Sequence, residues 1–533
     1  MKKRKSSSQF ELKKQLQSLR SICNVFDEQA LMKKKQLLSE ISLSKLNQPK
    51  KLFEYHQLLL FLSAYPQSKE LLLLAEKELH RVAASAKEIF DGKNERLRTQ
   101  LVNTGIANTQ LNISFSFHFV NWLLEEFHED VKLFSIDADD TTVEQVLCAC
   151  LPAIERDLIA DKMMSATQMI HRLKSDKQND LEFLVQLFGN AEVSVEVRDA
   201  LWDSLKIFIS WRLKTNSPSL TSGRSPARKT FFHTTPLLKK FEPQKTIQKF
   251  VDPPYKLNQN EKKQLVAAGR GVLAMLLRET DPVTYAYENA VELFDAGRGI
   301  DIALYPMIPE RRLPLESYIG YVAFKNRIPV AYGGGWIFLH RSKIGLNVLP
   351  AFRGGESSFL FTQILRVYHH HFNMKKFIVE PYQIGKNNLE GLKSGAFWFY
   401  YRLGFRPSSE KLSGIATREF EMISAEKNYR TPLSVMRQLA NSNLELNLSP
   451  EKYFPDSDPI SISKSAKELF STQKLKRRRH YSDTSDFIVA ANKLRKKEAS
   501  LLKKIFAQKY GGSERDFIFS LQKNHKLIEV ETS

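Results

Sequence analysis

The sequence predicts a multidomain α+β protein: an α-helical N-terminal domain, then a mixed β-sheet flanked by helices, then a basic, partly helical C-terminal extension. Three observations lead to this fold class. Apolar residues recur every three or four positions through most of residues 1–213, which is typical of helices. The composition then shifts to Ser, Thr, Pro and Lys over residues 214–257. Apolar runs of strand length follow one another between residues 300 and 380.

The predicted helical domain covers residues 1–213. Its apolar-rich segments lie at 58–62, 71–79, 119–127 and 181–188, and in their wider surroundings Glu and Lys separate the apolar residues. Asn, Thr and Gly interrupt this pattern at 103–109 and predict an extended loop, which serves as a plain connection or as a binding loop.

A linker and the start of a second domain follow. Residues 214–257 predict the linker because Ser and Pro dominate short stretches of it. Asn258 and Glu261 have the spacing of a capping box, so we expect a helix from there to residue 277. Pro282 disfavours helix at the residue before it, and a second helix is expected over 283–294. The sheet domain is predicted to span residues 258–445.

Strand signals then come in series. We expect strands over 300–305, 318–324 and 328–339, with a hairpin turn at Asn326 and Arg327. Gly333, Gly334 and Gly335 inside the third strand indicate either a bulge or the close approach of a ligand. A strand at 345–349, a helix over 356–370 and a strand at 377–380 follow. After a loop at 381–385, a helix around 396–403, a strand at 418–423 and a helix at 433–439 complete the domain.

The turn between the strand at 345–349 and the next helix is suited to holding an anion. It contains Gly354 and Gly355, which let the backbone come close to a ligand. The free N–H groups at the start of the helix point at such a ligand with the helix dipole behind them.

This ordered series resembles the GNAT superfamily of acyl-CoA-dependent N-acetyltransferases over roughly residues 258–425. Arg353 and Gly354 match the Arg-Gly of that family's turn, and Gly404 and Phe405 match its Gly-Phe pair. Tyr400 falls where the family has a general-acid tyrosine. The resemblance implies a GNAT-like sheet domain and direct acyl transfer from acetyl-CoA, as co-substrate, to an amine acceptor, without a metal.

The resemblance also implies site residues. Backbone amides of Asn347 and Val348 would hold the pantetheine arm, and Tyr400 would protonate the leaving thiolate. The base is expected to be Glu380 or Glu316, directly or through water. The turn that would bind the phosphates comprises Phe352, Arg353, Gly354, Gly355, Glu356 and Ser357.

Two positions depart from the family pattern and open a second interpretation. Ala351 and Glu356 replace the first and last residues of the turn motif, and the carboxylate of Glu356 is expected close to the phosphates. The alternative function is a catalytically degenerate binding protein on the same scaffold. For Tyr400 the alternative is a core position in an aromatic cluster. The consecutive His369, His370 and His371 point in different directions on a helix, so a structural role is expected for them.

Charge suggests a third interpretation. The chain has 80 Lys and Arg against 59 Asp and Glu, a net charge of +21, which favours nucleic acid or anionic surfaces as partners. The extension 446–533 is predicted as partly disordered and partly helical, with a helical stretch over 486–519 broken at Gly511 and Gly512. Its densest cationic run is Lys474, Leu475, Lys476, Arg477, Arg478, Arg479 and His480.

The compartment is predicted from the cysteines and the N-terminus. Only three cysteines occur, Cys23, Cys148 and Cys150, so a reducing, cytoplasmic location is expected. The pair Cys148 and Cys150 lies in an apolar run, which favours buried structural cysteines over metal ligands. The basic N-terminus has no apolar segment after it, and no stretch is long enough to span a bilayer.

Overall fold

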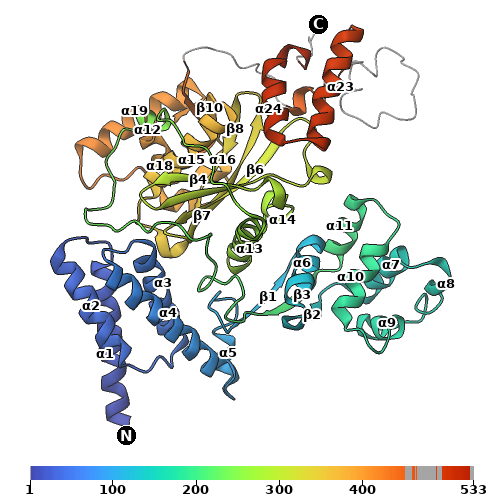
Figure 1. The fold of residues 1–533 in the computed structure, drawn as a ribbon, viewed down its shortest axis with the longest axis horizontal. Helices are drawn as coiled ribbons and strands as arrows, with labels where there is room; N and C mark the ends of the chain where they lie inside the picture. Colours follow the sequence, from blue (N-terminus) through green and yellow to red (C-terminus); the bar gives the residue numbers. More distant parts are fainter. Residues whose placement is uncertain (1, 450–458, 463, 465–487, 489–494, 529–533) are drawn as a thin grey trace. The chain divides into compact units, whose positions relative to one another are not determined.

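The computed structural model describes residues 2–449, 459–462, 464, 488 and 495–528, and it is a mixed α/β protein (Figure 1). The chain forms two compact units. The first comprises Met1–Arg224 and Ala267–Thr280, and the second comprises Ser225–Val266 and Asp281–Ser533. The boundary between Arg224 and Ser225 falls inside the segment 214–257, which the sequence predicts as a linker. Each unit therefore contains a part of that segment.

The first unit begins with four long helices, and side-chain caps at Asp27 and Ser68 fix the starts of the second and the fourth. A small antiparallel sheet follows, with strand order β1-β3-β2. The helices are α1 (Lys2–Ile22), α2 (Glu28–Ser42), α3 (Pro49–Ala64), α4 (Lys69–Phe90), α5 (Glu95–Thr99), α6 (Phe117–Phe127), α7 (Asp140–Cys150), α8 (Ala153–Arg156), α9 (Ala166–Leu173), α10 (Asp180–Asn190) and α11 (Val195–Ser204). The strands are β1 (Gln110–Ser114), β2 (Val131–Ile136) and β3 (Ile207–Arg212).

This sheet corrects the prediction of an all-helical domain over 1–213. Its strands are only five or six residues long and lie between strongly helical segments, so the helical period dominates any wider window. β3 nevertheless alternates buried and half-buried residues along its length. The expected loop at 103–109 is confirmed as a stretch of turns leading into β1.

The core of the first unit is aromatic. Trp202 is 1% exposed, and its indole Nε1 donates to the carbonyl of Phe115 at 2.9 Å. Trp211 on β3 is fully buried in the same apolar cluster. Cys150 belongs to this cluster and Cys148 packs against it, as expected for structural cysteines.

The second unit is built on one large sheet with strand order β11-β12-β10-β8-β7-β6-β5-β4, and β9 pairs with β7 beside β8. Every neighbouring pair is antiparallel except β8 and β10, which are parallel. The strands are β4 (Glu292–Gly297), β5 (Ile300–Tyr305), β6 (Ser317–Lys325), β7 (Ile328–Phe338), β8 (Arg341–Ile344), β9 (Asn347–Val348), β10 (Lys376–Val379), β11 (Arg406–Pro407) and β12 (Leu444–Asn447).

Helices cover this sheet on both faces. Tyr368 from α15 donates a hydrogen bond to Ile319 of β6, and a Cβ at the next residue, Gly320, would meet Pro282 of α14. Because neighbouring residues of a strand point to opposite faces, α15 and α14 lie on different sides. The helices of the second unit are α12 (Pro243–Ile247), α14 (Asp281–Thr284), α15 (Ser357–Phe372), α16 (Pro381–Ile384), α17 (Leu389–Ser394), α18 (Ala396–Arg402), α19 (Glu410–Ala425), α20 (Leu433–Leu439), α23 (Lys496–Gly511) and α24 (Glu514–Lys523). The helix α13 (Gln259–Met275) is divided between the units, since its residues from Ala267 on belong to the first.

Several predicted elements are confirmed at the level of single contacts. Asn258 and Glu261 form the expected capping box, with two bonds of 3.0 Å between each backbone N–H and the other side chain. Asn326 and Arg327 turn between β6 and β7 with φ of 46° and 72°, the left-handed conformation that tight hairpins need. The strand at 300–305 and the helix at 433–439 have the expected bounds.

Three predicted elements are wrong. The loop expected over 381–385 contains the short helix α16. The helix expected over 283–294 is instead the short α14, a 3₁₀ turn (Glu288–Ala290) and β4. The strand expected over 418–423 lies inside α19. The alternation of apolar and charged residues there falls on a largely exposed helix, in which Met422 is 41% exposed. The strands β8 and β12 were not predicted. Each is four residues long and follows an element with a clearer hydrophobic pattern, β7 and α20, after a turn or a loop.

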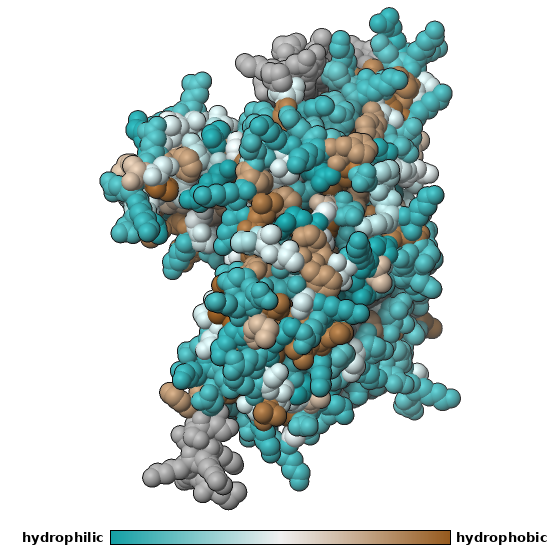
Figure 2. Space-filling model, turned by 60° about the vertical axis from the view of Figure 1, so that its left-hand side comes forward, coloured by the Kyte–Doolittle hydropathy of each residue, from teal (hydrophilic) through white to brown (hydrophobic). Residues whose placement is uncertain are grey.

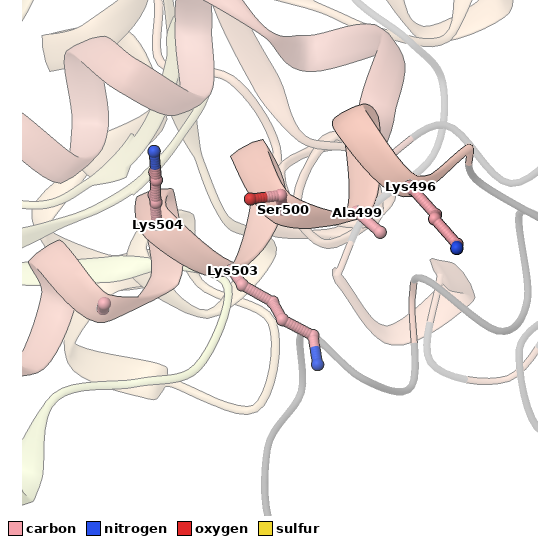
Figure 3. Close-up of a pocket in the computed structure, with 6 residues that line it drawn as sticks. Lys496, Ala499, Ser500, Lys503 and Lys504 are labelled. Atoms are coloured by element: carbon pink, nitrogen blue, oxygen red, sulfur yellow. The ribbon is translucent and has the colours of Figure 1, made fainter.

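The C-terminal helices α23 and α24 form a hairpin that packs on the second unit's sheet (Figure 1, red). The predicted break at Gly511 and Gly512 is confirmed as the turn between them. Their apolar residues Phe506 and Phe517 share a cluster with Phe338 of β7. The exposed face of α23 lines an open hollow of about 500 Å³. Its lining includes the side chains of Lys496, Lys503 and Lys504 (Figure 3).

Hydrophilic side chains cover most of the face drawn in Figure 2, as the high charge of the chain leads one to expect. None of the helices in the described part of the chain has both the length and the apolar character of a membrane span.

Candidate functional site

The candidate site lies where the parallel pairing of β8 and β10 stops. The two strands pair only from Arg341 with Lys376 to Lys343 with Ile378. Beyond this point the chain leaves β10, and β9 pairs with β7 through Asn347 and Tyr332. Residues 345–346 therefore form a break between β8 and β9, with no ladder partner on β10.

Two buried tyrosines direct their hydroxyl groups at this break. Tyr321 of β6 donates to the carbonyl of Gly345 at 2.5 Å. Tyr400 of α18 is 3% exposed and is hydrogen-bonded to the backbone of Leu346. Burial raises the pKa of Tyr400 to about 12, while the Leu346 hydrogen bond acts in the opposite direction. Both phenols are therefore neutral and hold their protons beside the same two residues.

The glycines of β7 make room for Tyr321 and for two other tyrosines, Tyr318 and Tyr368, which answers a question that the sequence left open. A Cβ at Gly333 would lie 2.5 Å from the hydroxyl oxygen of Tyr321, and one at Gly335 would lie 2.5 Å from the ring of Tyr368. The strand remains regular at these positions, pairing with residues 319–321 of β6. The close approach is thus by neighbouring tyrosine side chains and, at Gly333, also by the backbone carbonyl of Gly345.

The glycine turn follows β9 and leads into α15. Gly354 has φ of +96°, which favours glycine, and a Cβ there would meet nothing within 4 Å. The side chain of Arg353 is 62% exposed and its guanidinium bonds the carboxylate of Glu390 at 2.9 Å. The first amides of α15, starting at Ser357, have no partner within the helix. The turn thus presents an open glycine face beside a helix N-terminus.

Glu356 points into the protein, away from the open face of this turn. Its carboxylate is bonded by Lys325 at 3.0 Å, by Arg298 at 2.6 Å and by the backbone N–H of Leu238 at 2.8 Å. Burial opposes its ionisation, but the charge of Lys325 and these hydrogen bonds hold the pKa of Glu356 below its ordinary value. Burial also lowers the pKa of Lys325 to about 8, so the pair is charged at neutral pH. The two cations neutralise the carboxylate that departs from the family pattern.

The two candidate bases lie in different places. Glu380 directly follows β10, is half exposed, and pairs with Lys343 of β8 at 3.1 Å, which puts it beside the strand break. Glu316 precedes β6, whose first residue Ser317 pairs with Ile337, four residues along the strand from Tyr321. The structure thus brings Glu380 to the break and does not bring Glu316 to it.

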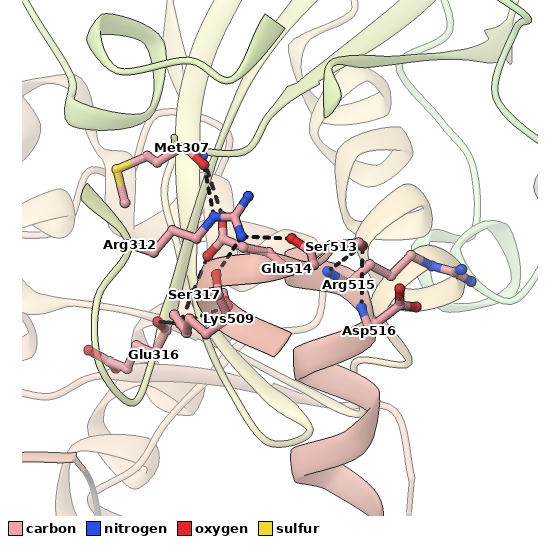
Figure 4. Close-up of polar contacts among 10 residues, drawn as sticks. Met307, Arg312, Glu316, Ser317, Lys509, Ser513, Glu514, Arg515 and Asp516 are labelled. Carbon is pink, nitrogen blue, oxygen red and sulfur yellow. Dashed lines mark hydrogen bonds and ion pairs between the residues drawn. The ribbon is translucent and has the colours of Figure 1, made fainter. Parts of the chain in front are cut away.

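Glu316 belongs to a different cluster, which joins β6 to the C-terminal helices (Figure 4). Its backbone carbonyl accepts a hydrogen bond from the ammonium of Lys509. Arg312 and Glu514 complete the cluster, and both side chains are 1% exposed. Burial lowers the pKa of Lys509 to about 7, and the Glu514 carboxylate counteracts that effect.

The three consecutive histidines each have a separate partner, as their directions on a helix require. The ring of His369 bonds the carbonyl of Met374, that of His370 bonds the carbonyl of Ile247, and that of His371 faces Glu292 at 2.8 Å.

Sequence reasoning missed three residues of this region: Tyr321, Lys325 and Arg298. Tyr321 and Lys325 lie on a strand whose residues are all buried, so nothing in the pattern separates them from core positions. The spacing of Lys325 and Arg298 from Glu356 in the chain gave no sign of an ion pair. The cationic run from residue 474 to 480 lies outside the described residues.

The chain matches no protein-family model, no curated protein and no solved structure. Its function is therefore argued from the geometry of the site.

Proposed function

We propose that the second unit is an N-acyltransferase that moves an acetyl or other acyl group from acyl-CoA to an amine. Four features support the proposal together. The sheet is antiparallel apart from β8 and β10, these two strands are joined through α15, the glycine turn precedes α15, and Tyr400 lies at the strand break. This is the order of elements that the GNAT resemblance implies.

The glycine turn is suited to the diphosphate of the coenzyme. Gly354 leaves its outer face open, and the amides at the start of α15 supply hydrogen-bond donors and positive dipole ends. Glu356 does not repel an anion there, because Lys325 and Arg298 hold its carboxylate inside. The pantetheine arm would then extend along β9, with Asn347 and Val348 as the backbone partners.

The chemistry follows from the groups at the break. The amine nitrogen attacks the thioester carbon, a C–N bond forms and the C–S bond breaks. The amine proton goes to Glu380, directly or through water, and Tyr400 gives its phenol proton to the leaving sulfur. Solvent returns the proton from Glu380 to Tyr400, so the products are an amide and free CoA. Holding amine and thioester in line supplies most of the acceleration.

The observation that carries this proposal is the hydroxyl of Tyr400 at the backbone of Leu346, inside the break. A phenol that stays protonated at neutral pH and lies beside the expected thioester has the right place for a general acid.

Calorimetric titration of the intact chain with acetyl-CoA tests the proposal, together with detection of free CoA thiol in the presence of a panel of amines. We expect binding and amine-dependent thiol release. Binding without release for every amine would favour the second function, a catalytically inactive acyl-CoA binding protein. Absence of binding, with no competition by free CoA, would remove both.

A third function, nucleic-acid binding, is favoured by the basic face of α23. Lys496, Lys503 and Lys504 line one surface hollow, and polyanions such as nucleic acid bind lysine-rich surfaces through their phosphates. Electrophoretic mobility of duplex and single-stranded probes across a salt series tests it. A steep loss of affinity with salt, reduced when these lysines are changed to glutamine, would support it.

A further inference from the structure

A cavity of about 270 Å³ in the second unit shares Arg298 with the ion pairs that hold Glu356, while its other lining residues belong neither to the glycine turn nor to the strand break. It lies between the β4–β5 turn and the β6–β7 turn, under the segment 228–231. Its lining combines one buried carboxyl group, Asp301, with two aromatic rings, Phe231 and Tyr255, and a basic rim.

The carboxyl group of Asp301 faces the cavity, with Arg228 as the opposite charge acting on it. Asp301 is 5% exposed and lines the cavity, and no described residue donates a hydrogen bond to its carboxyl oxygens. It stands directly opposite Asp295 across the β4–β5 ladder. Burial, and then the neighbouring charge of Asp295, raise the pKa of Asp301 to about 7, while Arg228 acts against both. Such a group is costly to bury without a donor, so the cavity has an unfilled place for one.

Flat cationic groups lie on the two aromatic rings of the lining. The guanidinium of Arg228 is 4.5 Å from the ring centre of Tyr255, and that of Arg298 is 5.1 Å from that of Phe231. Planar layers of this kind are the surfaces on which nucleic-acid bases stack in proteins.

Two of the lining arginines are held in strained backbone. Arg298 has φ of 54° and Arg327 has φ of 72°, a region in which glycine is the usual turn residue. The tight β4–β5 and β6–β7 turns need this conformation, and because glycine or asparagine adopts it more easily, each arginine stands there at an energetic cost. Here both side chains lie at one cavity.

We propose that this cavity binds a phosphorylated nucleoside. The N–H groups on the edge of its base donate to Asp301, the base lies against the arginine-covered rings, and the phosphate meets Arg327 and the exposed Lys229 at the rim. The basic rim would repel a simple cation, and the carboxylates of Asp295 and Asp301 would repel a simple anion. A nucleoside phosphate has a donor at one end and an anion at the other.

The size of the cavity restricts the ligand. It lies at the small end of ligand pockets, which suits one base with its sugar phosphate. The ligand is either a free nucleotide or the nucleotide end of a larger molecule such as coenzyme A. The inference stands independently of acyl transfer.

The test uses the intact chain and GMP, AMP and adenosine 3′,5′-bisphosphate as probes in calorimetry at pH 8. Adjacent donors on guanine match a carboxylate best, so GMP is expected to bind most tightly. Asp301→Asn and Arg327→Gly should each weaken binding at least tenfold. Arg327→Gly relieves the strained φ, so it should lose affinity while keeping or raising the unfolding temperature, which separates a lost site from a lost fold. The exposed Asp516→Asn in α24 is the matched control.

Two further arms decide between the sources of the ligand. Displacement of the nucleotide by free CoA, with weaker acetyl-CoA binding in Asp301→Asn, identifies the nucleotide end of the coenzyme. Unchanged nucleotide binding at saturating CoA identifies a separate nucleotide site. The inference is overturned if no probe binds, or if Asp301→Asn and Arg327→Gly bind as tightly as the unchanged chain. Acetyl-CoA turnover that persists in that case would leave the transferase proposal intact.

Discussion

Glu356 and Lys325 form an ion pair in which each side chain is 1% exposed and Oε2 lies 3.0 Å from Nζ. The pair ties the glycine turn to the end of β6, since Glu356 is the residue directly before α15 and Lys325 is the last residue of the strand. The pair also neutralises the carboxylate charge of Glu356, which the sequence predicts beside the proposed diphosphate.

Removing this buried carboxylate is expected to destabilise the second unit. Glu356→Gln leaves Lys325 and Arg298 without their anion, and breaking a buried pair costs about 3–5 kcal/mol. Chemical denaturation measures the loss. Glu390→Gln is the matched control, because its pair with Arg353 is exposed and contributes about 0–1 kcal/mol. Equal effects of the two substitutions would contradict a structural role for the buried pair.

The glycine turn is tested by adding one methyl group. Gly354→Ala meets no atom within 4 Å, but φ of +96° strains it, so we expect a loss of about 1–2 kcal/mol in stability and weaker acetyl-CoA binding. Gly414→Ala is the control, since Gly414 lies within α19 and its Cβ also meets nothing, and it should stabilise by up to about 1 kcal/mol. Calorimetry reads coenzyme affinity for both; equal affinity in the two variants would argue against the turn as the phosphate site.

The role of Tyr400 is tested by removing one oxygen. Tyr400→Phe keeps the ring in its aromatic contacts with Phe361 and Phe405 but removes the hydroxyl group at Leu346 and its proton. We expect turnover to fall by about 10²–10⁴-fold with acetyl-CoA affinity nearly unchanged. Tyr401→Phe, one residue away with its hydroxyl at Thr417, should keep normal turnover. Thiol-release rates under saturating substrate distinguish the two, and full turnover by Tyr400→Phe would exclude the acid role.

Asp301 predicts a pH-dependent stability. Its pKa is raised from 3.8 to about 7, so the folded protein holds this proton more tightly than the unfolded chain does. The free energy of unfolding is therefore reduced when this carboxyl group ionises. The reduction is absent below pH 3.8, grows as the pH rises from there to about 7, and reaches about 4 kcal/mol above pH 7. Asp301→Asn should therefore change stability little at pH 4 and raise it by a few kcal/mol at pH 8. Denaturation at both pH values measures this, and a pH-independent effect would refute the buried ionisation.

The C-terminal cluster predicts a local change in protection. Glu514→Gln removes the carboxylate that faces the buried Arg312 and Lys509, so α23 and α24 should loosen from the sheet. Hydrogen exchange of the amides in these helices reports it. Asp516→Asn on the exposed side of α24 should leave exchange unchanged. Protection that survives in Glu514→Gln would mean that apolar packing alone holds the hairpin.

Local signals in the sequence predicted much of the second unit, because they depend on neighbouring residues. The Asn258 capping box, the turn at Asn326 and the strand at 300–305 each follow from a few adjacent side chains. The glycine turn and the position of Tyr400 were likewise visible in short patterns. The GNAT assignment built on them stays a prediction.

What the sequence could not predict depends on contacts between distant segments. Glu356 lies 31 residues from Lys325 and 58 from Arg298, and no local pattern shows that three such charges meet. The short strand β3 pairs with β1 almost a hundred residues earlier, so its weak alternation was outweighed by the helices around it. The cavity at Asp301 arises from two turns and a separate segment, which only the fold brings together.

The Arg312–Lys509 contact has a consequence for biosynthesis. The Arg312 guanidinium binds the carbonyl of a residue made 197 positions later, so the ribosome releases β6 long before its covering hairpin exists. Until then the apolar surface around Phe338 is open to water and to other nascent chains. Chaperone occupancy during translation should accordingly peak in the interval between these two segments.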